Sequence, residues 1–254
     1  MKNKFIGIIP ARYASTRFPG KPLADLGGHP IIEHVYRRAL DVLDQVIVAT
    51  DDERIVDAVH NFDGNVVMTS PDHLSGTDRV CEAFELSDTD ANVIINIQGD
   101  EPFIAKDHIR KLMAQFDDPS TDIATLARPI GPDENYEIIA DPNLVKLVMA
   151  NNGTVLYFSR SVIPFVRGVD CSLWPSSTPY YAHIGIYAYR ANVLREITRI
   201  SRTSLEKSES LEQLRWLQNG YTIRAAVVES PTIGIDTPHD LELARKFYLE
   251  NNCK

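Results

Sequence analysis

The chain has 254 residues, of which 44% are hydrophobic and 24% are charged, as in a globular protein with a full core. This composition argues against a disordered, collagen-like or disulfide-stapled chain. There are 26 Lys and Arg against 35 Asp and Glu, so the formal net charge is −9. The molecule as a whole therefore has no attraction for nucleic acid or an anionic membrane, and any anion that it binds needs a local cluster of cations.

The sequence gives no sign of secretion or membrane insertion. Cys81, Cys171 and Cys253 are too scattered for a disulfide framework and favour a reducing compartment. The apolar run at residues 5–9 is shorter than a signal-peptide core, and Pro10 follows it instead of a cleavage site. No run approaches the ~18 apolar residues of a membrane span. We therefore expect a cytoplasmic protein.

The first half of the chain alternates short apolar runs with amphipathic stretches. The apolar runs lie at residues 5–9, 45–50, 66–69 and 92–97, and the amphipathic stretches at 31–40, 55–62, 80–84 and 109–116. Runs of Ile and Val without polar alternation are typical of strands buried on both faces. Strands that alternate with helices predict right-handed βαβ units in an open α/β sheet.

The pattern changes after about residue 120. Apolar stretches at 144–150 and 154–160 flank Asn151-Asn152-Gly153, which predicts a hairpin. The next expected elements are a loop at 167–179, a strand at 183–190, a helix at 208–219, a strand at 221–228 and a helix that starts at Thr237. We expect a single domain over residues 1–254 with an inserted, hairpin-bearing subdomain at about 125–190.

A cation-rich loop at residues 10–23 follows the first predicted strand. It contains Arg12, Arg17 and Lys21, with the hydroxyls of Ser15 and Thr16. Ligands of open α/β sheets bind beyond the carboxyl ends of the strands, and these cations suit phosphate oxygens. The loop matches neither a Walker A motif nor a dinucleotide fingerprint. It predicts a phosphate site, with a solvated basic loop as the alternative.

Two turns present carboxylates. Asp100 follows the predicted strand at 92–97, and Asp236 precedes the predicted helix start at Thr237. Magnesium usually takes one or two carboxylates together with substrate phosphates, so the two acids together would suit Mg²⁺. The alternatives are a helix cap for Asp100 and a helix-dipole partner for Asp236. Gly99 is expected to let a ligand approach the backbone.

Another segment pairs a hydroxyl with a cation at a helix start. Thr77 is expected to cap a helix that begins at Asp78, which puts Arg79 in the first turn. A cation in the first turn is unfavourable beside the positive end of the helix dipole. The presence of Arg79 there is therefore a weak indication that it binds an anionic partner.

A dispersed set of polar residues lies in the second half. His183 and Tyr187 are four residues apart in a predicted strand and therefore share one face. With Arg160 they would suit a polyhydroxylated acid, because a guanidinium binds a carboxylate and the other two bind hydroxyls. Glu212 and Gln213 complete the set. The alternative for each of these residues is a purely structural role.

Taken in order, these segments resemble the 3-deoxy-manno-octulosonate cytidylyltransferases, also called CMP-Kdo synthetases. The matching segments are 10–23, 49–52, 73–79, 96–102, 183–190, 211–215 and 234–241. The resemblance covers nearly the whole chain, and Phe18 stands where Leu is usual. The loop at 10–23 and Gln98-Gly99-Asp100-Glu101-Pro102 are shared with other sugar nucleotidyltransferases. Their combination with 73–79 and with the Tyr-containing strand at 183–190 indicates that the sugar substrate is Kdo.

The resemblance implies a Rossmann-like nucleotidyltransferase fold of the α/β class. The central sheet would be mostly parallel, and the mixed, hairpin-bearing subdomain would serve sugar binding and homodimerisation. The implied reaction transfers CMP from CTP to 3-deoxy-D-manno-octulosonate (Kdo) with Mg²⁺, releasing pyrophosphate and forming CMP-Kdo for lipopolysaccharide synthesis. The expected partners are these small molecules and a second copy of the chain, without nucleic acid or membrane.

The resemblance also implies residue roles. The implied catalytic residues are Arg12, Lys21, Asp100 and Asp236, of which the two acids would hold Mg²⁺. Nucleotide-binding residues would be Pro10, Ala11, Arg12, Lys21, Ser75 and Gln98. Kdo-binding residues would be Arg79, Arg160, His183, Tyr187, Glu212 and Gln213.

Three rival functions stay open at this point. A cytidylyltransferase for another acidic sugar, such as a sialic acid, would differ only in the sugar-binding set. A module that senses CTP without chemistry would have no use for Asp100 together with Asp236. A dinucleotide-dependent oxidoreductase is disfavoured by the missing glycine fingerprint.

Overall fold

The computed structural model describes residues 3–14, 17–230 and 234–252. It divides into two compact units, one made of residues 1–110 and 232–254 and the other of residues 111–231. Among the described residues, no helix is both long and apolar enough to cross a membrane.

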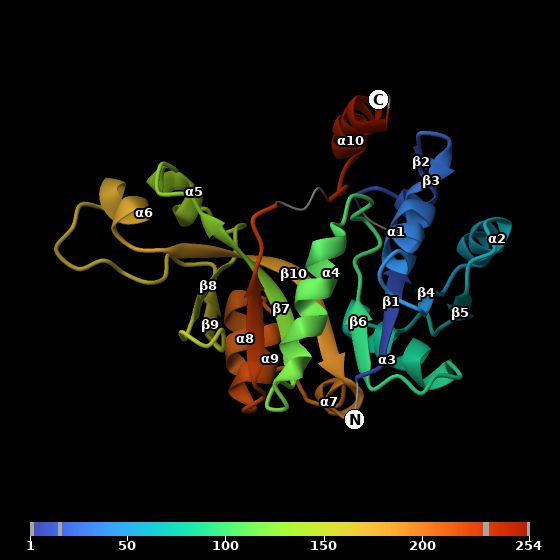
Figure 1. Cartoon of the computed structure of the whole chain (residues 1–254), viewed down its shortest axis with the longest axis horizontal. Coiled ribbons are helices and arrows are strands. Elements are labelled where there is room, and N and C mark those ends of the chain that lie inside the picture. The colour runs from blue at the N-terminus through green and yellow to red at the C-terminus, as the bar shows by residue number, and fades with distance from the viewer. Residues whose placement is uncertain (1–2, 15–16, 231–233, 253–254) are drawn as a thin grey trace. The chain divides into compact units, whose positions relative to one another are not determined.

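Four parallel strands form the sheet of the first unit (Figure 1). They are β1 (Phe5–Ala11), β4 (Val46–Thr50), β5 (Val66–Met68) and β6 (Val93–Asn96), in the order β6-β1-β4-β5. These are the four predicted apolar runs. Ile8 and Ile9 are both fully buried, so neighbours on opposite faces of β1 are covered. This two-sided burial is why the run shows no polar alternation.

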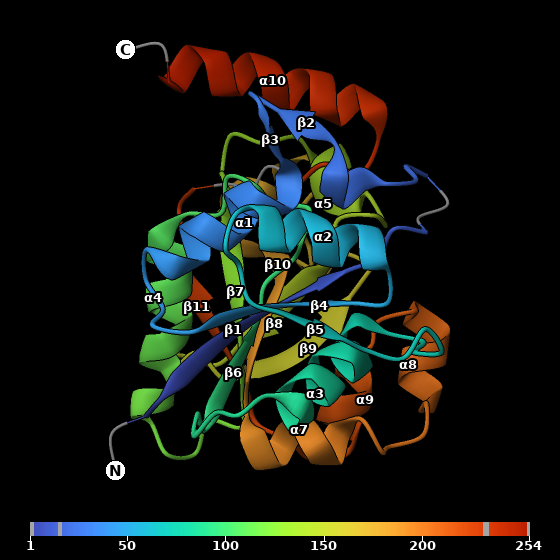
Figure 2. The same cartoon turned by 90° about the vertical axis from the view of Figure 1, so that its right-hand side faces the viewer.

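Helices cover both faces of this sheet. Figure 2 shows α1 (Ile31–Leu40) and α2 (Glu53–Asn61) on one face and α3 (Gly76–Leu86) on the other. Each helix lies where the sequence predicts a helical stripe. Leu40, the last residue of the predicted amphipathic stretch at 31–40, is 43% exposed. At about 100° per residue, Leu40 lies well beyond the stripe centred on Val35.

The first unit ends in α10 (Pro238–Asn252), which begins where the sequence predicts. The Thr237 amide donates to Asp240 Oδ2 at 2.8 Å, and the Asp240 amide donates to Thr237 Oγ1 at 3.2 Å. This reciprocal cap satisfies two free amides of the first turn. The helix lies against the short hairpin of β2 (Asp25–Leu26) and β3 (His29–Pro30), which the sequence did not indicate (Figure 2).

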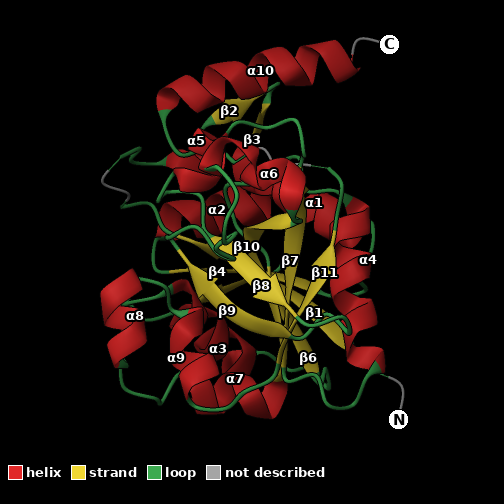
Figure 3. Cartoon of the chain, turned by 90° about the vertical axis from the view of Figure 1, so that its left-hand side faces the viewer, coloured by secondary structure: helices red, strands yellow, loops and turns green. Residues whose placement is uncertain are grey.

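Five strands form the mixed sheet of the second unit (Figure 3). They are β7 (Ile123–Ile130), β8 (Lys146–Met149), β9 (Val155–Ser159), β10 (Tyr180–Arg190) and β11 (Ile223–Val227), in the order β11-β7-β10-β8-β9. Only β7 and β11 are parallel. The predicted hairpin is β8–β9, with Gly153 at a φ of 84° in its turn. Strand β7 was not predicted.

Helices of the second unit depart from expectation in two places. The helix predicted at 208–219 is two helices, α8 (Ser204–Glu209) and α9 (Gln213–Gln218), because Ser210 takes a left-handed conformation with φ of 51°. The segment predicted as a loop at 167–179 contains a 3-10 turn (Cys171–Leu173) and α6 (Trp174–Ser177).

The remaining helices are α4 (Lys106–Ala114), α5 (Tyr136–Ala140) and α7 (Ala191–Ile197). Two further 3-10 turns cover Lys21–Leu23 and Gln115–Asp117. A small core forms around α5 and α6, where Ile139 and Trp174 are buried with Tyr180. A helix-covered parallel sheet in one unit and a mixed sheet in the other confirm the predicted α/β class.

Candidate active site

Lys21 is held at the start of a 3-10 turn by the loop before it. Gly20 precedes it with a φ of 72°, and the Gly20 amide donates to the Tyr13 carbonyl at 2.9 Å. A Cβ at position 20 would lie 3.2 Å from the Tyr13 ring, so glycine suits both the conformation and the space. The predicted hydroxyls of Ser15 and Thr16 lie outside the described residues.

The two acidic turns converge on Lys21. Its Nζ lies 2.7 Å from Asp100 Oδ2 and 3.4 Å from Asp236 Oδ1. The Ile235 amide donates to the Asp100 carbonyl at 2.9 Å, which fixes the two turns side by side. Arg17 Nη1 adds a second cation, 3.2 Å from Asp236 Oδ2. Two acids 136 positions apart in sequence thus share the Lys21 ammonium.

This arrangement fits a divalent cation. Asp100 and Asp236 already share one positive group, the Lys21 ammonium, and carboxylate oxygens are the ligands that Mg²⁺ prefers. In the part of the chain that the structure describes, no three His, Cys, Asp or Glu side chains gather into a metal cluster. Two carboxylates match the usual Mg²⁺ site, in which substrate phosphates and water supply the other oxygens.

Glu101 differs sharply from its neighbour Asp100. Burial, together with the charge of Asp100, raises the pKa of the Glu101 carboxyl to about 7. Its Oε2 is buried and has no hydrogen-bond partner among the described residues. Near neutral pH the Glu101 carboxyl is therefore ionised only in part.

A cavity of about 400 Å³ opens beside these groups. Its lining includes Pro10, Ala11, Arg12, Arg17, Lys21, Ser75, Gly76, Arg79, Gln98 and Asp100. They come from three segments, 10–22, 74–79 and 98–100, each of which the sequence singled out. The structure therefore gathers all the predicted nucleotide-binding residues around one cavity of the first unit.

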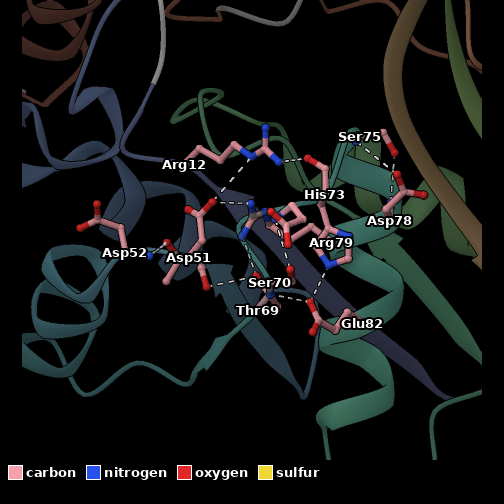
Figure 4. A network of polar contacts seen from close by, with 12 residues as sticks. Arg12, Asp51, Asp52, Thr69, Ser70, His73, Ser75, Asp78, Arg79 and Glu82 are labelled. Atoms are coloured by element: carbon pink, nitrogen blue, oxygen red, sulfur yellow. Dashed lines mark hydrogen bonds and ion pairs between the residues drawn. The ribbon is translucent and has the colours of Figure 1, made fainter.

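Arg12 is oriented by a polar network on the side of this cavity (Figure 4). Its Nη2 donates to the His73 carbonyl, and its Nε lies 4.0 Å from Asp51 Oδ2. The same Asp51 oxygen accepts from Arg79 Nη2 at 2.7 Å, and Arg79 Nη1 donates to Thr69 Oγ1 at 2.6 Å. Arg79 is only 1% exposed, so Asp51 neutralises a buried guanidinium while it faces Arg12.

Glu82 holds the turn that carries the His73 carbonyl (Figure 4). Glu82 Oε2 accepts from the Ser70 amide at 2.8 Å and from His73 Nε2 at 2.5 Å. Burial raises the pKa of Glu82, but the hydrogen bonds from His73 and Ser70 outweigh it, so the pKa is lowered overall. The local sequence around Asp51 and Glu82 did not indicate a role for either residue. The position of Asp51 directly after an apolar strand was the available signal.

One sequence-based expectation around this site is wrong, and it concerns the cap of α3. Ser75, not Thr77, caps α3, since Ser75 Oγ accepts from the Asp78 amide at 3.1 Å and Asp78 Oδ2 accepts from the Ser75 amide at 3.2 Å. Gly99 lines the cavity, and a Cβ at this position would lie 3.0 Å from the Pro10 carbonyl oxygen.

Most of the predicted sugar-binding residues lie in the second unit. The rings of His183 and Tyr187 are 5.4 Å apart, so the structure brings this pair together. Burial raises the pKa of Tyr187 well above its ordinary value, and its buried hydroxyl has no hydrogen-bond partner among the described residues. Gln213 is buried in α9, and Glu212 accepts from Arg215 Nη2 at 2.6 Å.

Arg160 is anchored on backbone carbonyls. Its Nε donates to the Glu209 carbonyl at 2.7 Å and its Nη1 to the Pro142 carbonyl at 2.8 Å. Its own amide donates to Glu209 Oε2 at 2.8 Å. Arg160 therefore ties the end of β9 to the end of α8. Of the predicted sugar set, only Arg79 lies in the first unit.

Comparison with known proteins identifies the family. The cytidylyltransferase family model matches residues 6–224. The chain is 57% identical over 244 residues to the 3-deoxy-manno-octulosonate cytidylyltransferase of Phocaeicola vulgatus, covering 96% of this chain and 97% of the relative. It is 52% identical to the enzyme of that name from Porphyromonas gingivalis, covering 96% of each chain.

A solved structure agrees in fold. A CMP:2-keto-3-deoxy-manno-octonic acid synthetase in complex with CTP superposes with a TM-score of 0.89 at 42% identity, over 98% of this chain and all of the other. The predicted nucleotidyltransferase fold is thereby confirmed. The chain belongs to the 3-deoxy-manno-octulosonate cytidylyltransferase family.

Proposed function

We propose that the protein transfers CMP from CTP to Kdo, with release of pyrophosphate and formation of CMP-Kdo for lipopolysaccharide synthesis. The names of its relatives and the CTP-bound neighbour support this reaction. The observation that carries it is the convergence of Asp100 and Asp236 on Lys21, beside the cavity that Arg12 lines. A site that only sensed a nucleotide would not need the two acids.

CTP would occupy the cavity of the first unit. Arg12 and Lys21 would bind the triphosphate, because a guanidinium and an ammonium together neutralise several oxygens. The backbone of residues 10–12, with Ser75 and Gln98 nearby, would bind the nucleoside. The Asp51–Arg79 pair supports this geometry, since it stabilises the loop side against which Arg12 lies.

Asp100 and Asp236 would hold Mg²⁺. A bound Mg²⁺ would supply positive charge to phosphate oxygens and favour ionisation of a nearby hydroxyl. The two carboxylates also hold the Lys21 ammonium in place before the nucleotide arrives.

The chemistry needs little covalent work from the protein. The oxygen of the Kdo 2-hydroxyl forms a bond to the α-phosphorus of CTP, the bond from that phosphorus to the bridging oxygen breaks, and pyrophosphate leaves. The proton of the hydroxyl passes to solvent. Positioning and electrostatics dominate such a transfer, and Arg12 and Lys21 provide both.

In the second unit, the residues that would bind Kdo are Arg160, His183, Tyr187, Glu212 and Gln213. The buried, unpartnered hydroxyl of Tyr187 supports a polar ligand there, because a buried polar group without a partner costs free energy.

We further propose a cytoplasmic homodimer. The exposed Leu156, which is 62% exposed on the β8–β9 hairpin, and Phe165, which is 72% exposed, support an interface in the second unit.

A coupled pyrophosphate assay tests the function. We expect pyrophosphate only when CTP, Mg²⁺ and Kdo are all present, and none when any one is omitted. Release with a sialic acid but not with Kdo would instead indicate a cytidylyltransferase for another acidic sugar. CTP binding without pyrophosphate release under any combination would contradict an enzymatic role.

A further inference from the structure

The β10 strand carries a bulge next to the proposed Kdo-binding pair. Its register on β7 shifts between Ile184 and Tyr187, so two residues of β10 have no ladder partner there. Thr125 of β7 lies against this bulge and is fully buried. Its Oγ1 is 2.9 Å from the Ile186 carbonyl oxygen and 3.2 Å from the Ile184 carbonyl oxygen. The Thr125 hydroxyl thus donates to carbonyl oxygens of the bulge, where β7 offers no backbone amide in register.

The same hydroxyl also contacts the imidazole of His183. Thr125 Oγ1 lies 3.0 Å from His183 Nε2. A threonine hydroxyl has one proton to donate and two lone pairs that accept. Because both carbonyl oxygens can only accept, the proton points to them and a lone pair is left for His183. Nε2 must then carry a hydrogen, or three acceptors would compete for one proton.

The environment of the ring keeps it neutral. Burial lowers the pKa of His183 to about 3, so the imidazole carries a single N–H at neutral pH. Its ring centroid lies 4.9 Å from that of Phe158 and 5.4 Å from that of Tyr187, and no carboxylate contacts it among the described residues. With the proton on Nε2, Nδ1 is a bare acceptor, and it makes no hydrogen bond within the described structure.

We infer that Thr125 is a positioning residue that fixes His183 as the Nε2–H tautomer, so that Nδ1 accepts a hydrogen bond from a hydroxyl of the bound sugar. The inference rests on the proposed function for the identity of that sugar. This tautomer would also make the site selective. A neutral nitrogen acceptor at Nδ1 binds a hydroxyl group and rejects a carboxylate or phosphate oxygen at the same place. Tyr187, whose hydroxyl is also unpartnered, supplies the complementary donor.

Nitrogen-15 NMR of the full-length protein with labelled histidine tests the tautomer without any substrate. At pH 7 we expect protonated Nε2 and unprotonated Nδ1 for His183, assigned by loss of these signals in His183→Gln. Thr125→Val removes the lone pair and should populate the other tautomer. Thr125→Ser keeps a hydroxyl and should restore the wild-type spectrum. A wild-type Nδ1–H tautomer, or an unchanged spectrum in Thr125→Val, overturns the inference.

Kinetics provide the second readout. The loss of one oriented hydrogen bond predicts a KM for Kdo about 3- to 10-fold higher in Thr125→Val, with the KM for CTP unchanged. Thr121→Val is the matched control, since Thr121 is equally buried and its hydroxyl donates to the Gln115 carbonyl at 2.7 Å, away from any histidine. It should change neither the His183 spectrum nor either KM.

The two hypotheses fail differently. An equal rise in the KM for Kdo in Thr125→Val and Thr121→Val would reduce Thr125 to a structural residue and overturn its positioning role. No turnover of Kdo by the wild-type protein would reject the proposed function, whereas the NMR spectrum would still decide which nitrogen of His183 carries the proton.

Discussion

The Lys21 ammonium lies 2.7 Å from Asp100 Oδ2, and the Lys21 side chain is only 14% exposed, so this ion pair is shielded from much of the solvent. Asp236 shares the same ammonium at 3.4 Å. Removal of either acid therefore leaves Lys21 with one remaining partner. Because Lys21 keeps a carboxylate partner in either case, the removal of one acid can lower turnover without a large change in the stability of the fold.

Asp100→Asn and Asp236→Asn should each lower kcat by about 10²–10³-fold, as expected when one electrostatic group of an active site is lost. Thermal unfolding should change little, because Lys21 keeps one carboxylate. Turnover at saturating Mg²⁺ and the unfolding midpoint check this. Asp90→Asn is the matched control, since Asp90 forms an exposed pair with Lys4. Near-normal turnover in either acid variant would remove that residue from the metal site.

Asp51→Asn should destabilise the fold by about 3 kcal/mol, because it leaves the buried Arg79 guanidinium without its negative partner. It should also weaken CTP binding, since Arg12 loses a nearby charge. Urea unfolding and CTP titration measure the two effects.

The neighbouring Asp52→Asn is the control for Asp51→Asn. Asp52 pairs with Arg54, which is 59% exposed, and an Asn at this helix cap can still accept from the Arg54 amide. We expect a loss below about 1 kcal/mol and unchanged CTP affinity. Equal effects of the two substitutions would show that Asp51 has no special role.

Arg160→Ala should raise the KM for Kdo at least tenfold while CTP binding is kept. It should also lower the unfolding midpoint by several degrees, because the Glu209 and Pro142 carbonyls lose their donor. Arg190→Ala is the matched control, since the Arg190 guanidinium donates to the Thr121 carbonyl at 2.7 Å and to two others. It should lower stability similarly without a specific effect on Kdo. Equal losses of Kdo and CTP affinity in Arg160→Ala would argue against a sugar-binding role.

His183 should make the stability of the protein depend on pH. Its pKa is lowered by burial from 6.5 to about 3, so below pH 6.5 the unfolded chain takes up a proton that the folded chain does not. The free energy of unfolding therefore falls as pH drops from 6.5 toward 3. Urea unfolding at pH 7 and pH 5 should show a smaller loss in His183→Gln than in the wild type. The same substitution at the exposed His60 is the control. Identical losses in wild type and His183→Gln would contradict a neutral, buried imidazole.

Local patterns in the sequence determined much of the first unit. A strand that is buried on both faces needs apolar residues at successive positions, and the run at 5–9 has them. A helix with one buried face needs apolar residues at helical spacing, and α1 has them. The cap of α10 was likewise readable, because Thr237 and Asp240 are only three residues apart. The order of the motifs was enough to indicate the family.

Only the tertiary structure decided which polar groups meet. The Lys21–Asp236 pair joins residues 215 positions apart, and Arg12 meets a carbonyl 61 positions away. Such contacts depend on strand order and on the paths of turns, which no local periodicity encodes. For the same reason the sequence did not reveal the break at Ser210 or the contact of Thr125 with the β10 bulge. The burial of an element can be predicted from the pattern of its own neighbouring residues. The partners of charged and hydrogen-bonding groups depend instead on how distant segments pack together.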